Sequence, residues 1–288
     1  MKFDEQAVVF DCAANRLLGI FTLPESPLET GVLIVVGGPQ YRAGSHRQFT
    51  LLARQLAGHG IASLRFDYRG MGDSEGEMRN FESVDTDIKA AVDMFLEHAA
   101  GINSVVIWGL CDAASAALYY ARSDSRISGL VLLNPWVHTV SGASRVRLKH
   151  YYLSRLLQRS FWAKLLSGKI ALRSSVGELT QSARDIAGKA NQAASAPANS
   201  WHGSRGYIDR MLDGLVNFHG EVLFILSGND PTAQEFEDIV SRDKQWKKAC
   251  LSPRISWERL REANHTFSTR AWRDQVGQWT IRRVDKGH

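Results

Sequence analysis

Short runs of apolar residues, each bounded by turn-forming residues, recur along the chain with room for a helix between most of them. Continuous apolar runs of this length are typical of strands that are buried on both faces of a sheet. The runs predicted as strands are Val32–Val36, Ala62–Phe66, Val105–Trp108, Leu130–Leu133, Val222–Leu226 and, with a less continuous pattern, Ile255–Leu260. Helical spacing is found in Phe49–Ala57, Ser83–Ala99, Asp112–Ala121, Ala233–Lys248 and Thr269–Ile281. Strands that alternate with helices predict a mostly parallel sheet with helices on both faces.

Two further segments near the start of the chain are predicted to form an antiparallel hairpin. They are Val8–Asp11 and Arg16–Leu23, and Asn15 is placed in the turn between them. Such a hairpin is expected at one edge of the sheet, which it extends to about eight strands. The predicted fold class is therefore α/β.

The alternation of strands and helices breaks once, between Trp136 and Phe218. That stretch has no clear buried strand, is rich in basic and aromatic residues, and shows helical spacing near His150–Leu166. It also contains the small, polar run at residues 193–200, which predicts a flexible piece of chain. A structureless loop of this length is uncommon in a compact domain unless it has a function. We expect residues 136–218 to form a helical cap insertion, and residues 1–135 and 219–288 to form the core.

The composition is that of an ordinary globular protein, with 288 residues of which 44% are hydrophobic and 23% charged. The three cysteines, Cys12, Cys111 and Cys250, are far apart and form no CxxC pair. Sparse cysteines argue against a disulfide framework or a zinc site and fit a reducing compartment. The first residues lack an apolar signal core, and no run approaches the about 18 apolar residues of a membrane span. We expect a cytoplasmic protein with no integral membrane segment.

The formal net charge of +5 is concentrated in one region. Between Trp136 and Gly220 the chain has twelve Lys or Arg residues against four Asp or Glu residues. This segment could meet an anionic substrate, a membrane surface or an acidic partner, or it could be an ordinary solvated surface. No nucleic-acid partner is expected, because the segment has no recognised nucleic-acid-binding signature.

A turn of small residues follows the apolar run Val105–Trp108, and Cys111 is at its tip. Gly109 stands two residues before Cys111, and Ala113 stands two residues after it. A nucleophile elbow needs this arrangement, because the chain reverses so tightly that only small residues fit at those two positions. The pattern predicts that Cys111 is a nucleophile, although a buried cysteine at a strand end is an alternative.

The predicted helix Asp112–Ala121 begins directly after Cys111. A helix N-terminus favours a negative charge, so this position is expected to favour the Cys111 thiolate. Ser115 is the other candidate nucleophile. It lies one turn into the helix, where a serine more commonly packs or caps.

Taken together, these elements resemble the α/β-hydrolase fold family over nearly the whole chain. That family orders its catalytic residues as nucleophile, acid and histidine. The resemblance implies that Asp230, after the run Val222–Leu226, is the acid that orients the histidine. It also implies that His265, on a loop after the last strand, takes the thiol proton and later activates water. Capping of the helix that begins near Thr232 is the alternative role for Asp230.

The family also forms an oxyanion hole from two backbone N–H groups. One is expected from Asp112, the residue after the nucleophile. The other is expected from residues 36–41, where Gly38 is the first choice and Gln40 the second, because Pro39 has no N–H. An ordinary Gly-Pro turn is the alternative for this segment.

Three basic residues, Arg42, His46 and Arg47, follow the expected oxyanion loop. Near the entrance of the site they could bind an anionic group of the substrate, such as a carboxylate, a phosphate or an acidic sugar. Each of these charges could equally belong to the plain surface.

The segment Phe66–Ser74 resembles the Asp-x-Arg-Gly-x-Gly-x-Ser loop of many α/β-hydrolases. Asp67 and Arg69 are expected to make structural hydrogen bonds there, and to support the fold without taking part in catalysis.

Three segments narrow the resemblance, namely GGPQYRAGSHRQF at residues 37–49, WGLCDAAS at residues 108–115 and SGND at residues 227–230. They are similar to the exosortase A system-associated hydrolases, which are α/β-hydrolases found in bacterial exopolysaccharide and exosortase gene clusters. This resemblance implies a biological context more than a reaction.

The leading hypothesis is a hydrolase that acts on an ester, thioester or lactone through Cys111, His265 and Asp230, with a thioester acyl-enzyme. An acyltransferase with the same residues is one alternative. An α/β-hydrolase scaffold that binds a ligand or partner without turnover is another. The expected partner is a small-molecule acyl substrate, and no cofactor or metal is expected, because no His, Cys and Asp cluster has metal-ligand spacing.

Overall fold

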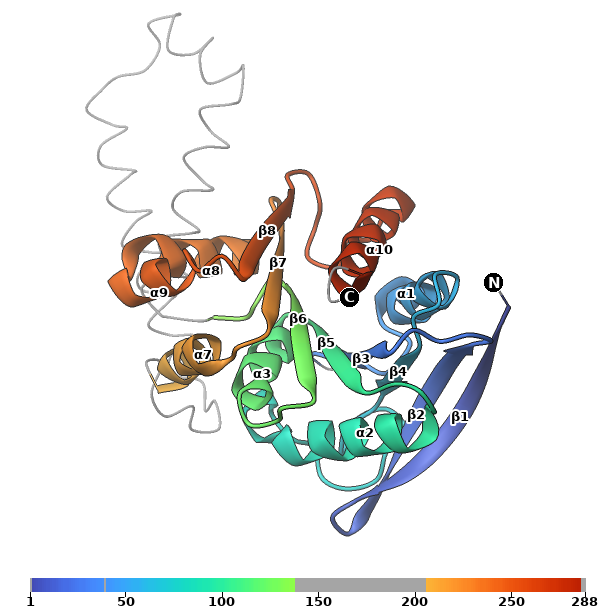
Figure 1. The fold of residues 1–288 in the computed structure, drawn as a ribbon. Coiled ribbons are helices and arrows are strands. Elements are labelled where there is room, and N and C mark those ends of the chain that lie inside the picture. Colours follow the sequence, from blue (N-terminus) through green and yellow to red (C-terminus); the bar gives the residue numbers. More distant parts are fainter. Residues whose placement is uncertain (1, 39, 138–205, 286–288) are drawn as a thin grey trace, which may run out of the picture. The chain divides into compact units, whose positions relative to one another are not determined.

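The computed structural model describes residues 2–38, 40–137 and 206–285 (Figure 1). It contains an eight-stranded sheet in the order β1-β2-β4-β3-β5-β6-β7-β8. The strands are β1 (Phe3–Cys12), β2 (Asn15–Pro24), β3 (Thr30–Val35), β4 (Ser63–Phe66), β5 (Ser104–Leu110), β6 (Ile127–Leu133), β7 (Glu221–Ser227) and β8 (Ile255–Leu260). Strand β2 pairs antiparallel with β1 and β4, and the other neighbours pair in parallel. The predicted mostly parallel sheet with an edge hairpin is confirmed.

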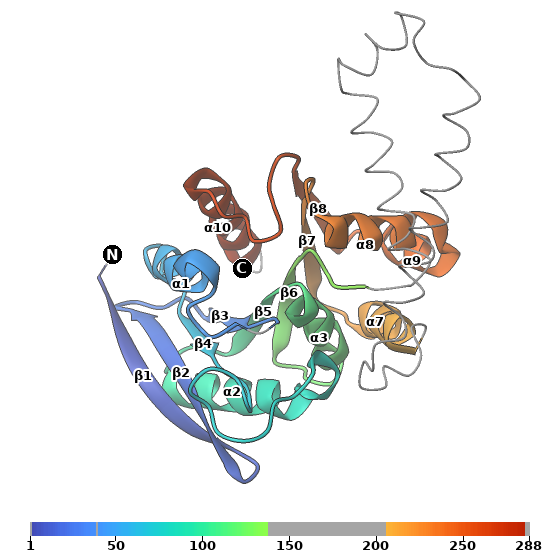
Figure 2. The same ribbon diagram turned by 180° about the vertical axis from the view of Figure 1, so that it is seen from behind.

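Helices cover both faces of this sheet (Figures 1 and 2). Helices α1 (Gln48–Ala57) and α10 (Arg270–Asp285) pack on one face, together with the apolar side chains that point towards them. The other face is covered by α2 (Asp85–His98), α3 (Asp112–Ala121), α7 (Gly206–Asn217), α8 (Pro231–Arg242) and α9 (Lys244–Ala249). Short 3₁₀ turns are formed by Ser45–Arg47 and Phe81–Ser83.

The strands β3, β5, β6 and β7 are largely apolar because both of their faces are buried. In β3 the side chains of Val32 and Ile34 pack on the face of α1 and α10, whereas Leu33 and Val35 pack on the opposite face. In β5, Trp108 packs on the same face as Val32 and Ile34. Successive residues of a strand alternate between faces, and one continuous apolar run therefore supplies two cores.

The hairpin differs from the prediction at its turn. Asn15 pairs with Cys12 in the β1–β2 ladder, so Asn15 belongs to the strand and not to the turn. The turn is formed by residues 13 and 14, and Ala13 takes a positive φ of 53°. A two-residue connection of this kind needs left-handed backbone to match the twist of the strands.

The predicted helix Ala233–Lys248 is two helices in the structure. Asp243 ends α8 and caps α9, because its carboxylate accepts hydrogen bonds from the N–H groups of Gln245 at 2.8 Å and Trp246 at 3.1 Å. An aspartate at this position starts a new helix, because it satisfies N–H groups that have no partner within the helix.

Helix α7 lies within the range predicted as a cap insertion, and it packs against α3. The approach is close, because a side chain at Gly214 would clash with the carbonyl of Leu118. The rest of the predicted insertion, including the periodic stretch His150–Leu166, lies outside the described residues, so the predicted domain boundaries stay a prediction.

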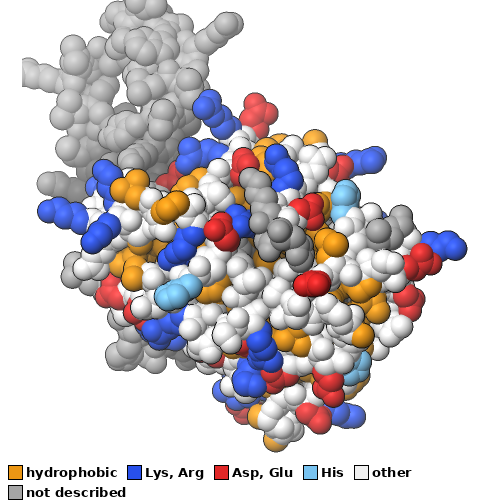
Figure 3. All heavy atoms as spheres, viewed as in Figure 1, with side chains coloured by type: hydrophobic (Ala, Val, Ile, Leu, Met, Phe, Trp, Pro, Cys, Tyr) orange, Lys and Arg blue, Asp and Glu red, His pale blue; other side chains and the backbone are white. Residues whose placement is uncertain are grey.

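Charged side chains of both signs are interspersed over the described surface seen in Figure 3. Much of the basic segment that carries the charge surplus of the sequence lies outside the described residues. In the part of the chain that the structure describes, no helix is both long and apolar enough to span a bilayer.

Candidate active site

Cys111 lies in a strained turn between β5 and α3. Its φ of 64° and ψ of −124° put a non-glycine residue in a region that L-amino acids rarely adopt. The predicted need for a small residue at position 109 is confirmed, because a Cβ on Gly109 would lie 2.7 Å from the backbone of Ala113. This geometry is the one expected for a nucleophile elbow at the carboxyl end of a central strand.

The thiol of Cys111 is protonated at neutral pH. Burial raises the pKa of Cys111 to about 12, and the negative charges of Asp112 and Asp230 act in the same direction. The N–H of Asp112 acts against them but is outweighed. The start of α3 does favour the thiolate, as expected, but desolvation exceeds this effect. Cys111 needs a base before it can attack.

His265 and Asp230 are hydrogen-bonded at the same edge of the sheet. The His265 Nδ1 atom lies 2.8 Å from Asp230 Oδ2, and the Asp230 residue is only 3% exposed. A carboxylate accepts, so Nδ1 donates and Nε2 is left without a proton in the neutral imidazole. The described residues contain no hydrogen bond between Cys111 Sγ and His265, so the predicted contact between them stays a prediction.

Asp230 also caps helix α8. Its carboxylate accepts from the N–H of Thr232 at 3.1 Å and from the N–H of Ala233 at 3.3 Å. The helix-capping alternative is thus confirmed, and the bond to His265 exists beside it. One carboxylate holds the helix start and the imidazole in a fixed relation.

Asn134 holds the His265 loop and was not identified from the sequence. It is fully buried at the end of β6, with a φ of 43°. Its Nδ2 donates to Ser227 Oγ at 2.8 Å and to the His265 carbonyl at 3.1 Å, while its Oδ1 accepts from the Ser227 N–H at 2.9 Å. The available signal was an asparagine directly after a buried strand, where a polar side chain has to find partners.

The two predicted oxyanion donors of the 36–41 segment both have partners in this structure. The N–H of Gly38 donates to Asp112 Oδ1 at 2.7 Å, and the N–H of Gln40 donates to the Gly38 carbonyl at 2.8 Å. The carboxylate of Asp112 therefore lies where an oxyanion bound to Gly38 would lie.

Burial raises the pKa of the Asp112 carboxyl. The backbone N–H groups of Gly38, Ala113 and Asp112 itself stabilise the charged form, but they offset only part of this effect. Of these, the Gly38 N–H makes a hydrogen bond to the carboxylate at 2.7 Å. The protein's own side chain therefore occupies this donor.

Arg42 is paired within the protein, and its predicted role in substrate binding stays a prediction. Its guanidinium is paired with Asp67 and, at 2.7 Å, with Asp73, and its backbone N–H donates to Asp67 Oδ1 at 2.6 Å. Asp67 is completely buried, so the charge of Arg42 compensates a buried carboxylate. The structural role predicted for Asp67 is confirmed.

The same loop contains a second buried ion pair, between Arg69 and Asp87. Arg69 Nη2 lies 2.7 Å from Asp87 Oδ2, with Nε donating to Oδ1 at 2.9 Å. The two parallel hydrogen bonds tie the loop after β4 to helix α2, which confirms the structural role predicted for Arg69.

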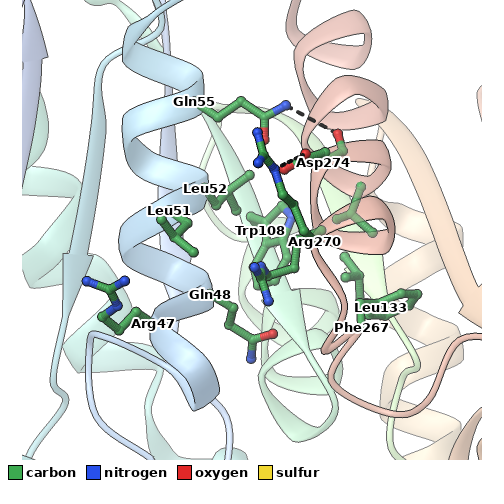
Figure 4. A pocket seen from close by; sticks show the side chains of 12 residues that line it. Arg47, Gln48, Leu51, Leu52, Gln55, Trp108, Leu133, Phe267, Arg270 and Asp274 are labelled. Carbon is green, nitrogen blue, oxygen red and sulfur yellow. Dashed lines mark hydrogen bonds and ion pairs between the residues drawn. The ribbon is translucent and has the colours of Figure 1, made fainter.

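His46 and Arg47 are exposed on the loop that leads into α1, with φ values of 53° and 59°. Arg47 lines a cavity between α1 and α10 (Figure 4). Substrate binding by His46 and Arg47 stays a prediction. Among the described residues, no group of three or more His, Cys, Asp or Glu side chains is arranged to hold a metal ion.

The model of the family described as "Serine aminopeptidase, S33" matches residues 30–245, well over half of the chain. The protein belongs to this α/β-hydrolase family. The α/β-hydrolase fold predicted from the sequence is thereby confirmed.

Curated relatives match parts of the chain. The polyketide transferase grgF of a Penicillium species is 30% identical over 100 residues, which is 33% of each protein. The quorum-quenching protein AidA of Acinetobacter baumannii is 29% identical over 145 residues, which is 47% of this chain and 45% of AidA. The chain thus spans between a third and a half of the length of these relatives.

Solved structures match nearly the whole chain. The Pyrococcus furiosus esterase Pf2001 has a TM-score of 0.62 at 15% identity, with 98% of this chain and 94% of that one covered. A dienelactone hydrolase from Anabaena variabilis also has a TM-score of 0.62 at 15% identity, with 99% of each chain covered. At this identity the likeness concerns the fold alone.

The description of the S33 family names a serine enzyme, whereas this chain has Cys111 at the tip of the elbow. Ser115 does not take its place, because it is fully buried inside α3 and its hydroxyl donates to the Trp136 carbonyl at 2.8 Å. A serine held in this way is a packing residue.

Proposed function

We propose that this S33-family hydrolase cleaves an ester, thioester or lactone with Cys111 as nucleophile, His265 as base and Asp230 as the acid that orients His265. The observation that carries the proposal is the 2.8 Å bond between His265 Nδ1 and Asp230 Oδ2 at the sheet edge that bears the strained Cys111 turn. A nucleophile followed along the chain by an acid and a histidine is the order of α/β-hydrolases.

The reaction begins with proton transfer from the Cys111 thiol to His265 Nε2. Asp230 stabilises the resulting imidazolium, and the thiolate attacks the carbonyl carbon of the substrate. His265 returns the proton to the leaving oxygen or sulfur as the C–O or C–S bond breaks, which leaves a thioester on Cys111. Water that gives its proton to His265 then attacks this thioester, and the carboxylic acid leaves as the Cys111 thiol re-forms.

The oxyanion of each tetrahedral intermediate would accept from the backbone N–H groups of Asp112 and Gly38. The Gly38 N–H is bonded to the Asp112 carboxylate in the resting protein, so the substrate carbonyl has to replace that carboxylate.

We further propose a substrate in which the acyl group is anionic or linked to a saccharide, within an exosortase or exopolysaccharide context. The support is the likeness of residues 37–49, 108–115 and 227–230 to exosortase A system-associated hydrolases. A reducing compartment, such as the cytoplasm, suits the proposal, because a catalytic thiol stays reduced there.

Acyl transfer to an alcohol is a second candidate function. The observation that favours it is the similarity to a protein named polyketide transferase. In that case an acceptor hydroxyl gives its proton to His265 and attacks the thioester in place of water.

Hydrolysis of short p-nitrophenyl esters, combined with iodoacetamide labelling, tests the assignment of the nucleophile. We expect Cys111→Ala to lose turnover and labelling at position 111, whereas the matched variant Ser115→Ala keeps both. Turnover that survives in Cys111→Ala and disappears in Ser115→Ala would overturn the proposal. Added alcohols that divert acyl product from acid to ester would favour acyl transfer over hydrolysis.

A further inference from the structure

A cavity of about 400 Å³ opens between helices α1 and α10, beside the catalytic loops but not lined by Cys111, Asp230 or His265 (Figure 4). Its apolar lining comes from both helices, from the ends of β5 and β6, and from the loop after β8. These apolar side chains are Leu51, Leu52, Trp108, Leu133, Phe267 and Val276. A largely apolar wall of this extent is typical of a small-molecule site.

Two buried N–H donors in this lining have no hydrogen-bond partner. They are Nε1 of Trp108, a residue that is 3% exposed, and Nε2 of Gln48, a residue that is 8% exposed. Trp108 packs edge-on against Phe49 with a ring separation of 5.6 Å, so its N–H direction is set by packing. Buried polar groups in proteins almost always have partners, and two unpartnered donors beside one cavity indicate an acceptor that binds there.

Positive charge surrounds the same cavity. Its charged lining residues are Arg47, Arg270, Arg273 and Asp274. Arg270 lies 3.4 Å from the Asp274 carboxylate, and Arg273 donates to the Ser268 carbonyl at 2.6 Å. Within the described part of the chain Arg47 forms no ion pair, and Figure 4 shows its guanidinium at the start of α1, on the opposite side of that helix from the Gln48 amide. The surplus of positive charge favours an anion.

We propose that this cavity is a binding site for a small organic carboxylic acid with an apolar body. The carboxylate accepts from Trp108 Nε1 and Gln48 Nε2 under the field of Arg47, and the apolar body packs against Leu52 and Phe267. Trp108 precedes Cys111 by three residues, and Phe267 follows His265 by two. The occupant therefore contacts elements that carry the catalytic residues. Binding itself requires no turnover, so this proposal does not depend on the assignment of the nucleophile.

Calorimetric titration of the full chain with octanoate, octanamide and inorganic phosphate tests the proposal. Octanoate and octanamide share an apolar body and differ in charge, and phosphate has charge without that body. We expect octanoate to bind at least about tenfold more tightly than octanamide. We also expect phosphate to bind more weakly than octanoate.

Three variants link binding to this cavity. Trp108→Phe keeps the ring beside Phe49 and removes the N–H, and Arg47→Gln removes an exposed charge without disturbing the core. Each is expected to weaken octanoate binding by about fivefold or more. The matched control Arg16→Gln, at the β1–β2 hairpin, should bind octanoate as the wild type does. Equal affinity for octanoate and octanamide, no binding up to about 10 mM octanoate, tighter binding of phosphate, or wild-type affinity in Arg47→Gln would overturn the proposal.

Discussion

The backbone N–H of Gly38 donates to the Asp112 carboxylate at 2.7 Å, so the residue after Cys111 takes the acceptor position that a substrate oxyanion would need. The same carboxylate raises the pKa of the Cys111 thiol through its negative charge. Asp112 thus restrains the nucleophile and occupies the N–H of Gly38 at once. Only the effect on the Cys111 thiol depends on the charge of Asp112, so a neutral isostere at this position separates the two effects.

Asp112→Asn should make Cys111 more reactive. The amide oxygen still accepts from Gly38, but the negative charge beside the sulfur is gone, so the thiolate fraction rises. We expect the rate of alkylation by iodoacetamide at pH 8 to increase about tenfold. Peptide mass spectrometry measures this rate site by site, and Cys250 in the same sample is the internal control. An unchanged rate at Cys111 would show that Asp112 exerts no such restraint.

The alkylation rate of Cys111 in the wild-type protein should keep rising with pH well above the range of an ordinary thiol. Only the thiolate reacts, and burial raises the pKa of Cys111 to about 12. Below that pKa the thiolate fraction increases about tenfold for each pH unit. We therefore expect a steady rise from about pH 7 to about pH 10 without a plateau. A plateau below about pH 9 would mean that His265 takes the thiol proton in the resting protein.

Two substitutions should separate the capping role of Asp230 from its role beside His265. Asp230→Asn retains a side-chain oxygen that can cap α8, but it no longer favours the productive tautomer and the cation of His265. We expect esterase activity to fall by about 10³-fold or more with little loss of stability. Asp230→Ala loses the cap as well, and should cost about 1 kcal/mol more in urea denaturation. Equal stability of the two variants would contradict the capping role.

The strands and the Cys111 turn could be predicted from the sequence because their signals are local. A continuous apolar run is in itself the sequence signal of a strand in a parallel sheet. The predicted helix Asp112–Ala121 has those same bounds in the structure. The role of Arg42 could not be predicted in this way, since its partner Asp67 is 25 residues away and only the folded loops bring them together. The raised pKa of Cys111 could not be predicted either, because burial outweighs the helix terminus and burial depends on the whole fold.

Arg42→Gln should affect stability and leave substrate binding unchanged. The substitution leaves the buried Asp67 carboxylate without its compensating charge, which we expect to cost about 3 kcal/mol of unfolding free energy. The KM for a neutral p-nitrophenyl ester should stay near the wild-type value. Arg47→Gln is the matched control, because Arg47 is exposed and its loss should change stability by less than about 0.5 kcal/mol. A rise in KM without a loss of stability in Arg42→Gln would restore its role in substrate binding.

Asn134 should be a positioning residue for His265. Asn134→Gly keeps a backbone that tolerates the positive φ and removes the side chain that donates to the His265 carbonyl. We expect kcat to fall by at least about tenfold while KM stays within about twofold, because the loop that carries the base loses its support. Ser227→Ala is the control, since it removes the hydroxyl that Asn134 also contacts but leaves the bond to His265 intact. Because both changes remove a buried hydrogen bond and lower stability, only the split between kcat and KM separates positioning from simple packing. Equal losses of kcat in the two variants would mean that Asn134 only packs in the core and does not position His265.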